Sequence, residues 1–179
     1  MREYWANAEA TAETLVDGWL HTGDIGEIDP RTQALRITDR KKDIIVTAGG
    51  KNVAPQKIEN LLKTQKLISQ VVVHGDKRKF LSALITLDPE QLELFAKDRS
   101  LAGEYASLTQ HPEVEKEVQR LVDESNRELA SYETIKKFKV LEEDFSVESG
   151  ELTPKLSVKR KVVNSRHGHH LDAFYAEKF

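Results

Sequence analysis

The stretch "QVVVHGDKRKFLSALITLDPEQLELFAKDR" at residues 70–99 decides the class of fold. Two β-rich runs, 70–76 and 81–87, are separated by a basic turn, which predicts two adjacent strands. A proline at position 89 then opens a segment with helical character, as expected for a first helical position. Strands followed by a helix predict an α/β arrangement around a small sheet.

The segments on both sides of this stretch extend the same pattern. Before it, "IIVTAGGKN" (44–52) predicts a short buried strand and a glycine turn, and a helix begins at Pro55. After it, residues 112–130 form the clearest amphipathic helix, "KKFKVLE" (136–142) a last strand, and "SVKRKVVNSRH" (157–167) leads into a further helix. We therefore expect an α/β (α+β) domain with a roughly three-stranded sheet flanked by helices.

The first forty residues have a different character. "IGEID" (25–29) and "ALRIT" (34–38) alternate in polarity and predict a β-hairpin. The next five residues, "DRKKD" (39–43), are all charged, which indicates an exposed connector. "NAEATAETL" (7–15) is typical of a helix, yet no core element precedes it. The first two dozen residues therefore look like the edge of something larger.

Composition excludes several classes of protein. The chain has 179 residues, of which 39% are hydrophobic and 32% charged, and its net charge is −3. A general nucleic-acid binder would show a basic excess, so the charge argues against that function. The absence of cysteine excludes disulfides and thiolate metal sites and suits a reducing cytosol. No apolar run is long enough to span a bilayer, and we expect no cleaved signal at the N-terminus.

Four short motifs each allow more than one interpretation. In "HTGD" (21–24), Asp24 is able to accept both hydroxyls of a ribose, or it simply completes a turn. Gly49 and Gly50 either expose backbone N–H groups or form an ordinary turn. The basic run 155–161 suits a solvated helix face, a targeting signal, a nucleic-acid patch or a phosphate contact. "RHGHH" (166–170) invites a metal, but no carboxylate shares a clear spacing with it, so we predict no metal site.

Three of these strings together resemble a known family. "GWLHTGDIGEID" (18–29), "DRKKDIIVTAGGKNVAPQKIE" (39–59) and "ELTPKLSVKRK" (151–161) are similar to three consecutive signatures of the adenylate-forming, AMP-dependent superfamily. "TPKLSVKRK" with "LDAFYAEKF" (171–179) looks most like the long-chain fatty-acyl-CoA synthetase branch. The resemblance covers nearly the whole chain, but only the C-terminal third or so of such an enzyme.

The resemblance implies a division of the chain and a nucleotide site. Residues 1–41 would be the tail of the large N-terminal AMP-binding domain, and residues 42–179 a small mobile lid with its hinge at Lys42. Asp24 would bind the ribose hydroxyls of ATP or AMP, Arg40 would reach the same ribose, and Ile37 would pack near the nucleoside. The chain departs from the family pattern at Ala54, where a capping serine is expected before the helix.

The resemblance also assigns roles within the lid. Gly49 and Gly50 would line the tunnel for the pantetheine of coenzyme A, and Lys159 would be the lysine needed for adenylation. The long-chain branch usually carries another lysine where this chain has Ser157. Lys155 is an added basic group, so Lys155 and Lys161 stand as alternative carriers of the role of Lys159.

The implied activity is that of an ATP-dependent long-chain fatty acid–CoA ligase in fatty acid metabolism. A carboxylate attacks the α-phosphate of ATP to give an acyl-adenylate and pyrophosphate, and the thiol of CoA then displaces AMP. Mg²⁺ would accompany ATP, held by the missing N-terminal domain together with the phosphate loop and acyl tunnel. We therefore expect this chain alone to be inactive.

The implied partners are that domain, fatty acid, ATP and CoA, with no nucleic acid. We expect a cytoplasmic location with at most peripheral membrane contact. Two alternatives stay open: an adenylation domain acting on a different carboxylate, and a non-catalytic nucleotide-sensing or interaction module of the same fold.

Overall fold

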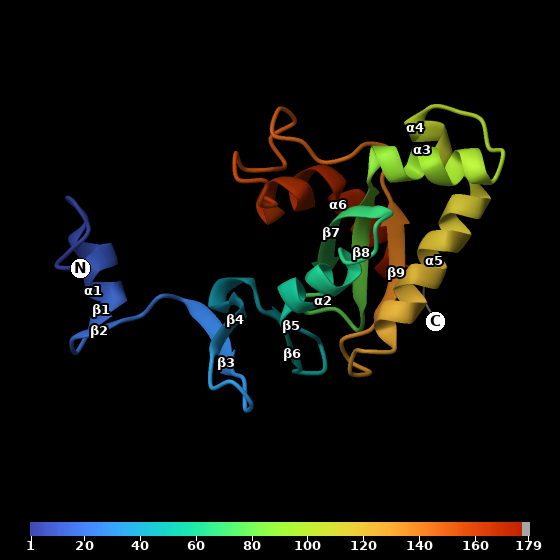
Figure 1. Cartoon of the computed structure of the whole chain (residues 1–179). Coiled ribbons are helices and arrows are strands. Elements are labelled where there is room, and N and C mark those ends of the chain that lie inside the picture. Colours follow the sequence, from blue (N-terminus) through green and yellow to red (C-terminus); the bar gives the residue numbers. More distant parts are fainter. Residues whose placement is uncertain (177–179) are drawn as a thin grey trace. The chain divides into compact units, whose positions relative to one another are not determined.

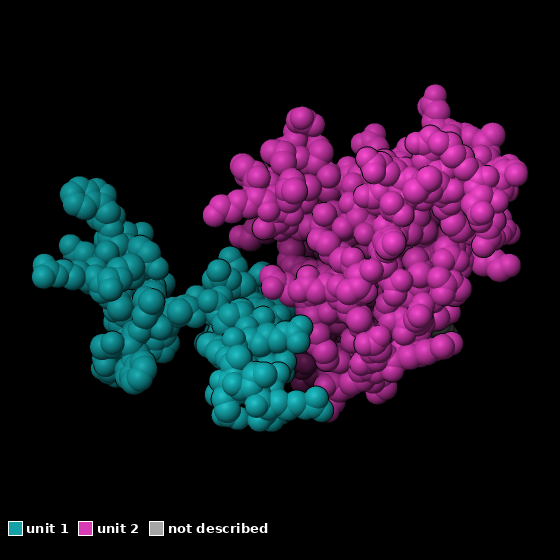
Figure 2. Space-filling model, viewed as in Figure 1, with its two compact units in different colours: residues 1–44 teal, residues 45–179 magenta. Residues whose placement is uncertain are grey.

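Three strands form the centre of the larger part of the molecule: β7 (Ile68–His74), β8 (Leu81–Leu87) and β9 (Ile135–Val140). The computed structural model describes residues 1–176. It divides into two compact units, Met1–Ile44 and Ile45–Phe179, which are coloured separately in Figure 2. The last three residues of "LDAFYAEKF" lie outside the described part of the chain.

The sheet of the second unit has the strand order β7-β8-β9. β7 and β8 pair antiparallel across their turn, with Val72 opposite Leu84. β9 runs parallel to β8, with Leu81 opposite Ile135. Parallel neighbours need a long crossover, and the helical segment between β8 and β9 provides it. The predicted three-stranded sheet is thus confirmed.

In the described part of the chain, five helices surround this sheet: α2 (Pro55–Leu62), α3 (Pro89–Asp98), α4 (Tyr105–Thr109), α5 (Pro112–Asn126) and α6 (Arg160–Ala176). α2, α3 and α5 begin at a proline, whose missing N–H costs nothing in the first turn. The Asp88 side chain caps α3 by accepting from the N–H of Gln91. Ala54, at the same position before α2, makes no such bond, as the sequence predicted.

The two faces of the sheet bury separate apolar clusters. Val71 and Val73 of β7 join the larger cluster with α2, α3 and α5. Val72, which points the other way, packs in a second cluster with Val163 and Leu171 of α6. Figure 1 shows the sheet between α6 and helices α2 and α5. The α6 helix therefore depends on the sheet for its burial, and the chain that leads into α6 is held against this second face.

The clearest predicted helix is shorter than expected. Residues 112–130 were predicted as helical, whereas α5 ends at Asn126. The Asn126 side chain instead bonds both backbone groups of Ile135, donating to its oxygen at 3.0 Å and accepting from its nitrogen at 2.9 Å. Leu129 still packs against the larger cluster although it lies beyond the helix.

The first unit contains α1 (Ala8–Thr14), β1 (Leu15–Val16), β2 (Trp19–Leu20), β3 (Asp24–Ile28), β4 (Leu35–Arg40) and the short 3₁₀ helix η1 (Lys41–Asp43). β3 and β4 form the predicted antiparallel hairpin. The prediction that all of "DRKKD" is an exposed connector is wrong for its first residue, because Asp39 lies within β4 and is fully buried. Its carboxylate accepts the N–H of Arg40 at 2.6 Å, which compensates for lost water.

Lys42 lies in η1, two residues before the boundary between the units. Among residues 1–176, no helix is long and apolar enough to cross a membrane.

Candidate functional site

Asp24 and Arg40 face each other at the open end of the β3–β4 hairpin. They are direct partners in the strand register, and Arg40 Nε lies 2.8 Å from Asp24 Oδ1. The Asp24 side chain is 25% exposed and the Arg40 side chain 51% exposed. A carboxylate and a guanidinium therefore present donors and acceptors side by side at a surface that a ligand is able to reach.

The turn before β3 is tied to the end of β4. The Thr22 hydroxyl accepts the N–H of Asp24 at 3.1 Å, and the Gly23 carbonyl accepts the N–H of Lys41 at 2.8 Å. Gly23 has φ +73°, a conformation that favours glycine. Ile37 lies on the same strand as Arg40 and is 55% exposed, so its side chain is available for contact. The first unit thus holds together the three residues predicted to bind a nucleoside.

Gly49 and Gly50 lie in the turn between β5 (Ile45–Val46) and β6 (Asn52–Val53). The N–H of Gly50 donates to the Thr47 carbonyl at 2.9 Å, and Gly50 has φ +72°. The turn is anchored to the β7–β8 connection, because the N–H of Ala48 donates to the Arg78 carbonyl at 2.9 Å. Both glycines are exposed on a backbone that is fixed at its base.

Lys159 is exposed and immediately precedes α6. Its N–H donates to the Glu151 carbonyl at 2.8 Å, and its own carbonyl accepts the N–H of Val162 at 2.9 Å. The two alternative lysines, Lys155 in the preceding turn and Lys161 in the first turn of α6, are also exposed. These hydrogen bonds hold both backbone polar groups of Lys159.

A solvated helix face, one of the interpretations that the basic run 155–161 allows, does not apply to Arg160. Its side chain is 22% exposed and its Nη2 lies 2.5 Å from Oε2 of Glu59 in α2. Arg160 Nη1 also donates to the Val73 carbonyl at 3.3 Å, and Glu59 Oε1 accepts the Val73 N–H at 2.7 Å. Neighbouring basic residues in the sequence therefore differ in role: Arg160 fixes the start of α6 to the sheet, and Lys159 projects outward.

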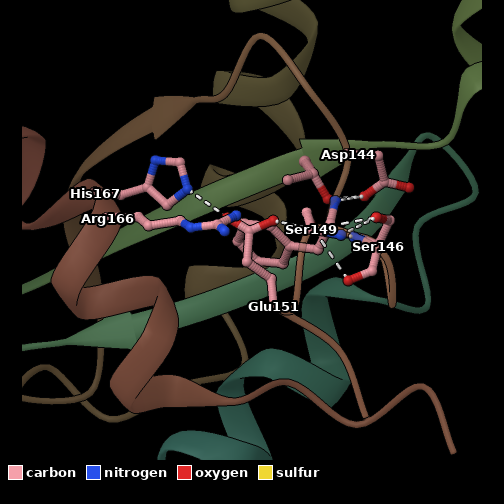
Figure 3. Close-up of polar contacts among 8 residues, drawn as sticks. Asp144, Ser146, Ser149, Glu151, Arg166 and His167 are labelled. Atoms are coloured by element: carbon pink, nitrogen blue, oxygen red, sulfur yellow. Dashed lines mark hydrogen bonds and ion pairs between the residues drawn. The ribbon is translucent and has the colours of Figure 1, made fainter. Parts of the chain in front are cut away.

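Sequence reasoning missed Glu151 and His167, which meet below the loop that carries Lys159. Figure 3 shows their side chains with those of Ser146 and Ser149. His167 belongs to the "RHGHH" motif, but its partner is a buried carboxylate 16 positions earlier in the chain. Only the tertiary structure reveals that pairing.

Other histidines of that motif do not complete a metal site. The pKa of His170 is lowered, first because burial disfavours the imidazolium and then because His169, Lys139 and His167 lie near it. Within residues 1–176, no group of three His, Cys, Asp or Glu side chains is placed to hold a metal ion.

The predicted site residues are divided between the units. Asp24, Ile37, Arg40 and Lys42 belong to the first unit, and the structure brings Asp24 and Arg40 into contact. Gly49, Gly50 and Lys159 belong to the second unit, where the two glycines share a turn and Lys159 lies at the start of α6.

The chain matches the family described as "AMP-binding enzyme C-terminal domain" over residues 42–178. It is 44% identical over 174 residues to the long-chain-fatty-acid–CoA ligase FadD15 of Mycobacterium tuberculosis, covering 96% of this chain and 29% of the relative. It is 38% identical over 179 residues to the human long-chain-fatty-acid–CoA ligase 6, covering 97% of this chain and 25% of the relative. The chain thus spans under a third of the length of these relatives.

Solved structures show the same fold. The adenylation domain of a carboxylate reductase from Mycobacterium chelonae aligns with a TM-score of 0.77 at 29% identity, over 98% of this chain and 26% of that one. The corresponding domain from Segniliparus rugosus, in complex with AMP and a co-purified carboxylic acid, aligns with a TM-score of 0.75 at 28% identity, over 97% of this chain and 26% of that one.

Proposed function

Because the chain belongs to the family of AMP-binding enzyme C-terminal domains, we propose that it serves as the mobile lid of a long-chain fatty acid–CoA ligase. The proposed whole enzyme activates a fatty acid with ATP to an acyl-adenylate and then transfers the acyl group to CoA, releasing AMP and pyrophosphate. The names of the relatives from M. tuberculosis and human support this choice of substrate.

The observation that carries the proposal is the placement of Lys159. In the first half-reaction an anionic carboxylate must approach the anionic α-phosphate, and a fixed cation between them stabilises the transition state. Lys159 offers such a cation: its ammonium extends from a backbone held at both the N–H and the carbonyl. A compact point charge on a long stem suits contact with both anions.

The Asp24–Arg40 pair supports a nucleoside site in the same reaction. One carboxylate accepts two ribose hydroxyls, and Arg40 orients that carboxylate through its 2.8 Å contact while offering further donors. Ile37, exposed on the same strand, supplies apolar contact beside the nucleoside. In this proposal Asp24, Ile37 and Arg40 bind ATP and AMP.

The second half-reaction uses a different surface of the lid. We propose that the chain rotates at Lys42, near the boundary between the two units, and that Gly49 and Gly50 then line the path of the CoA pantetheine. A glycine turn without side chains lets a narrow ligand pass close to the backbone. The same lid thereby serves two successive reactions, as hinge motions do in other enzymes.

The remaining components belong to the large domain that we propose precedes this lid. Mg²⁺ is expected to enter with ATP, and that domain is expected to hold it together with the acyl chain. The proposed location is cytoplasmic, which the cysteine-free sequence suits, and the proposed membrane contact is at most peripheral.

The test uses the full-length protein that joins this lid to the large domain. With a long-chain fatty acid, ATP, Mg²⁺ and CoA, we expect acyl-CoA and AMP to form in equal amounts. The 179-residue chain alone is expected to form neither product. If the full-length protein releases AMP with fatty acid but forms no thioester, the CoA ligase proposal is wrong.

A second candidate is an adenylation domain that acts on a different carboxylate. The high structural similarity to the adenylation domains of carboxylate reductases favours it. A panel of aromatic, short-chain and long-chain acids in the same assay separates the two. A non-catalytic nucleotide-sensing or interaction module would bind AMP without turnover of any acid.

A further inference from the structure

The loop that leads to Lys159 is a hairpin that begins next to Glu151. Leu152 and Val158 form an antiparallel bridge, and the N–H of Thr153 donates to the Ser157 carbonyl at 2.8 Å. Residues 152–158 are therefore a tight hairpin. Its base is completed by the N–H of Lys159, which donates to the Glu151 carbonyl at 2.8 Å.

The carboxylate of Glu151, the residue that precedes this hairpin, is buried. Its side chain is 7% exposed and lies between a turn and a helix. Oε2 accepts the Ser149 hydroxyl at 2.8 Å, and Oε1 lies 2.7 Å from His167 Nε2 in α6. Arg166 Nη1 lies 3.6 Å from the same Oε1. Figure 3 shows these groups converging on Glu151 from both sides.

The turn before Glu151 is itself held by side chains. The hydroxyls of Ser146 and Ser149 lie 3.1 Å apart, and the N–H of Ser149 donates to the Ser146 hydroxyl at 2.9 Å. The N–H of Leu152 donates to the Ser146 carbonyl at 3.0 Å. A carboxylate removed from water is costly unless donors surround it, so the surrounding groups restrict Glu151 to one position.

We propose, on the basis of the function proposed above, that Glu151 is the positioning residue for Lys159 in the adenylation half-reaction. Its carboxylate fixes residue 151 to the Ser146–Ser149 turn and to His167 on α6. Its carbonyl then fixes the backbone of Lys159. Lys159 is eight residues from Glu151 and eight from His167 along the chain, yet its backbone is held, so that only its side chain needs to be ordered when ATP binds.

A ligand-binding site beside Glu151 explains the burial of its carboxylate less well than the positioning role does. A cleft of about 480 Å³ opens beside Glu151 and His167. Its lining mixes carboxylates, Glu142 and Glu143, with the cations Lys139 and Arg166. Such a mixture selects neither an anion nor a metal ion. The internal pairing of Glu151 accounts for its burial without a ligand.

The test separates the two half-reactions in the full-length protein. Adenylation is followed by fatty-acid-dependent exchange of labelled pyrophosphate into ATP, and the second step by thioester formation from supplied acyl-adenylate and CoA. We expect Glu151→Ala to slow adenylation by about 10–100-fold, since a misplacement of the order of 1 Å has effects of that size, and to leave the second step unchanged. Glu151→Gln, which still accepts hydrogen bonds, is expected to restore most of the adenylation rate.

Two controls make the result interpretable. Asp88→Ala removes the cap of α3, which lies outside the 146–159 segment, and serves as a variant with a comparable general loss of stability. If Glu151→Ala slows both steps in parallel, as a merely destabilised lid would, or slows neither, the positioning role is wrong. Lys159→Ala tests the proposed function separately: if it spares adenylation, the lysine assignment fails whatever Glu151 does.

A second measurement needs no activity. In the 179-residue chain, amide hydrogen exchange is expected to be slower at Lys159 than at Lys155, which lies exposed within the turn. Glu151→Ala is expected to speed exchange at Lys159 more than at Val73 of the sheet. Equal exchange at Lys159 and Lys155 in the parent chain would contradict the anchored backbone.

Discussion

Replacing Glu59 by alanine should be among the most damaging single changes in the second unit. Glu59 is 9% exposed, and it joins α2 to both β7 and the start of α6. Its removal leaves the N–H of Val73, a residue 3% exposed, without its carboxylate acceptor, and the Arg160 guanidinium without its counter-charge. An orphaned buried donor costs about 1–3 kcal/mol, and breaking a buried ion pair from one side costs about 3–5 kcal/mol in total.

We therefore expect Glu59→Ala to lower the free energy of unfolding by about 3–5 kcal/mol. Arg160→Ala should also be destabilising, because it leaves the buried Glu59 carboxylate without its guanidinium counter-charge. The double variant should be less destabilised than the sum of the two single changes, by about 0.5–3 kcal/mol. That difference measures the coupling between the two side chains.

The assay is urea unfolding of the 179-residue chain followed by far-ultraviolet circular dichroism. Tryptophan fluorescence is unsuitable, because both tryptophans, Trp5 and Trp19, belong to the first unit. Glu93→Ala, which removes an exposed pair with Lys97 on α3, is the matched control and should leave the midpoint unchanged. If Glu59→Ala shifts the midpoint no more than Glu93→Ala does, Glu59 does not hold α2 and α6 to the sheet in the way proposed.

Three further changes have defined outcomes. Ala54→Ser should stabilise the chain by about 1 kcal/mol in the same unfolding assay, since Ala54 has the extended conformation of a cap without a capping side chain; no gain would mean that α2 needs no cap. Gly49→Leu should leave folding and adenylation intact, because an added Cβ would meet only Thr47 Oγ1 at 3.9 Å. The larger side chain should slow thioester formation by narrowing the proposed CoA path, and an unchanged thioester rate would argue against that path. Burial raises the pKa of Tyr105 to about 12, so the unfolded chain loses this proton at a lower pH than the folded chain does, and the free energy of unfolding should fall as the pH rises from 10 towards 12. Tyr105→Phe should flatten that part of the pH profile of the unfolding free energy. An unchanged slope would contradict the raised pKa of Tyr105.

Local patterns in the sequence predict the elements well for a physical reason. The alternation of apolar and polar residues in "IGEID" and "ALRIT" depends only on residues close together in the chain. The same is true of the prolines at which α2, α3 and α5 begin. The three-stranded sheet and the β3–β4 hairpin follow from such local signals. The end of α5 does not, because the side chain of Asn126, the last residue of the helix, binds the backbone of Ile135 in β9.

The same distinction applies to the candidate site. Asp24 and Arg40 carry recognisable chemistry in recognisable strings, and the structure pairs them. Arg160 and Glu59 are 101 positions apart, and nothing in either local sequence indicates that they meet. Asp39 was judged by the charges beside it, whereas its burial depends on the hairpin and on the N–H of Arg40. Buried polar partners are therefore the part of the site that only the tertiary structure supplies.

We propose that Lys159 acts in adenylation and not in thioester formation. The most direct measurement compares both half-reactions in the full-length protein and its Lys159→Ala variant, under the same concentrations of ATP and fatty acid. In the variant we expect pyrophosphate exchange to fall by about 10²–10³-fold, while thioester formation from supplied acyl-adenylate is unchanged. Undiminished pyrophosphate exchange in Lys159→Ala would contradict it.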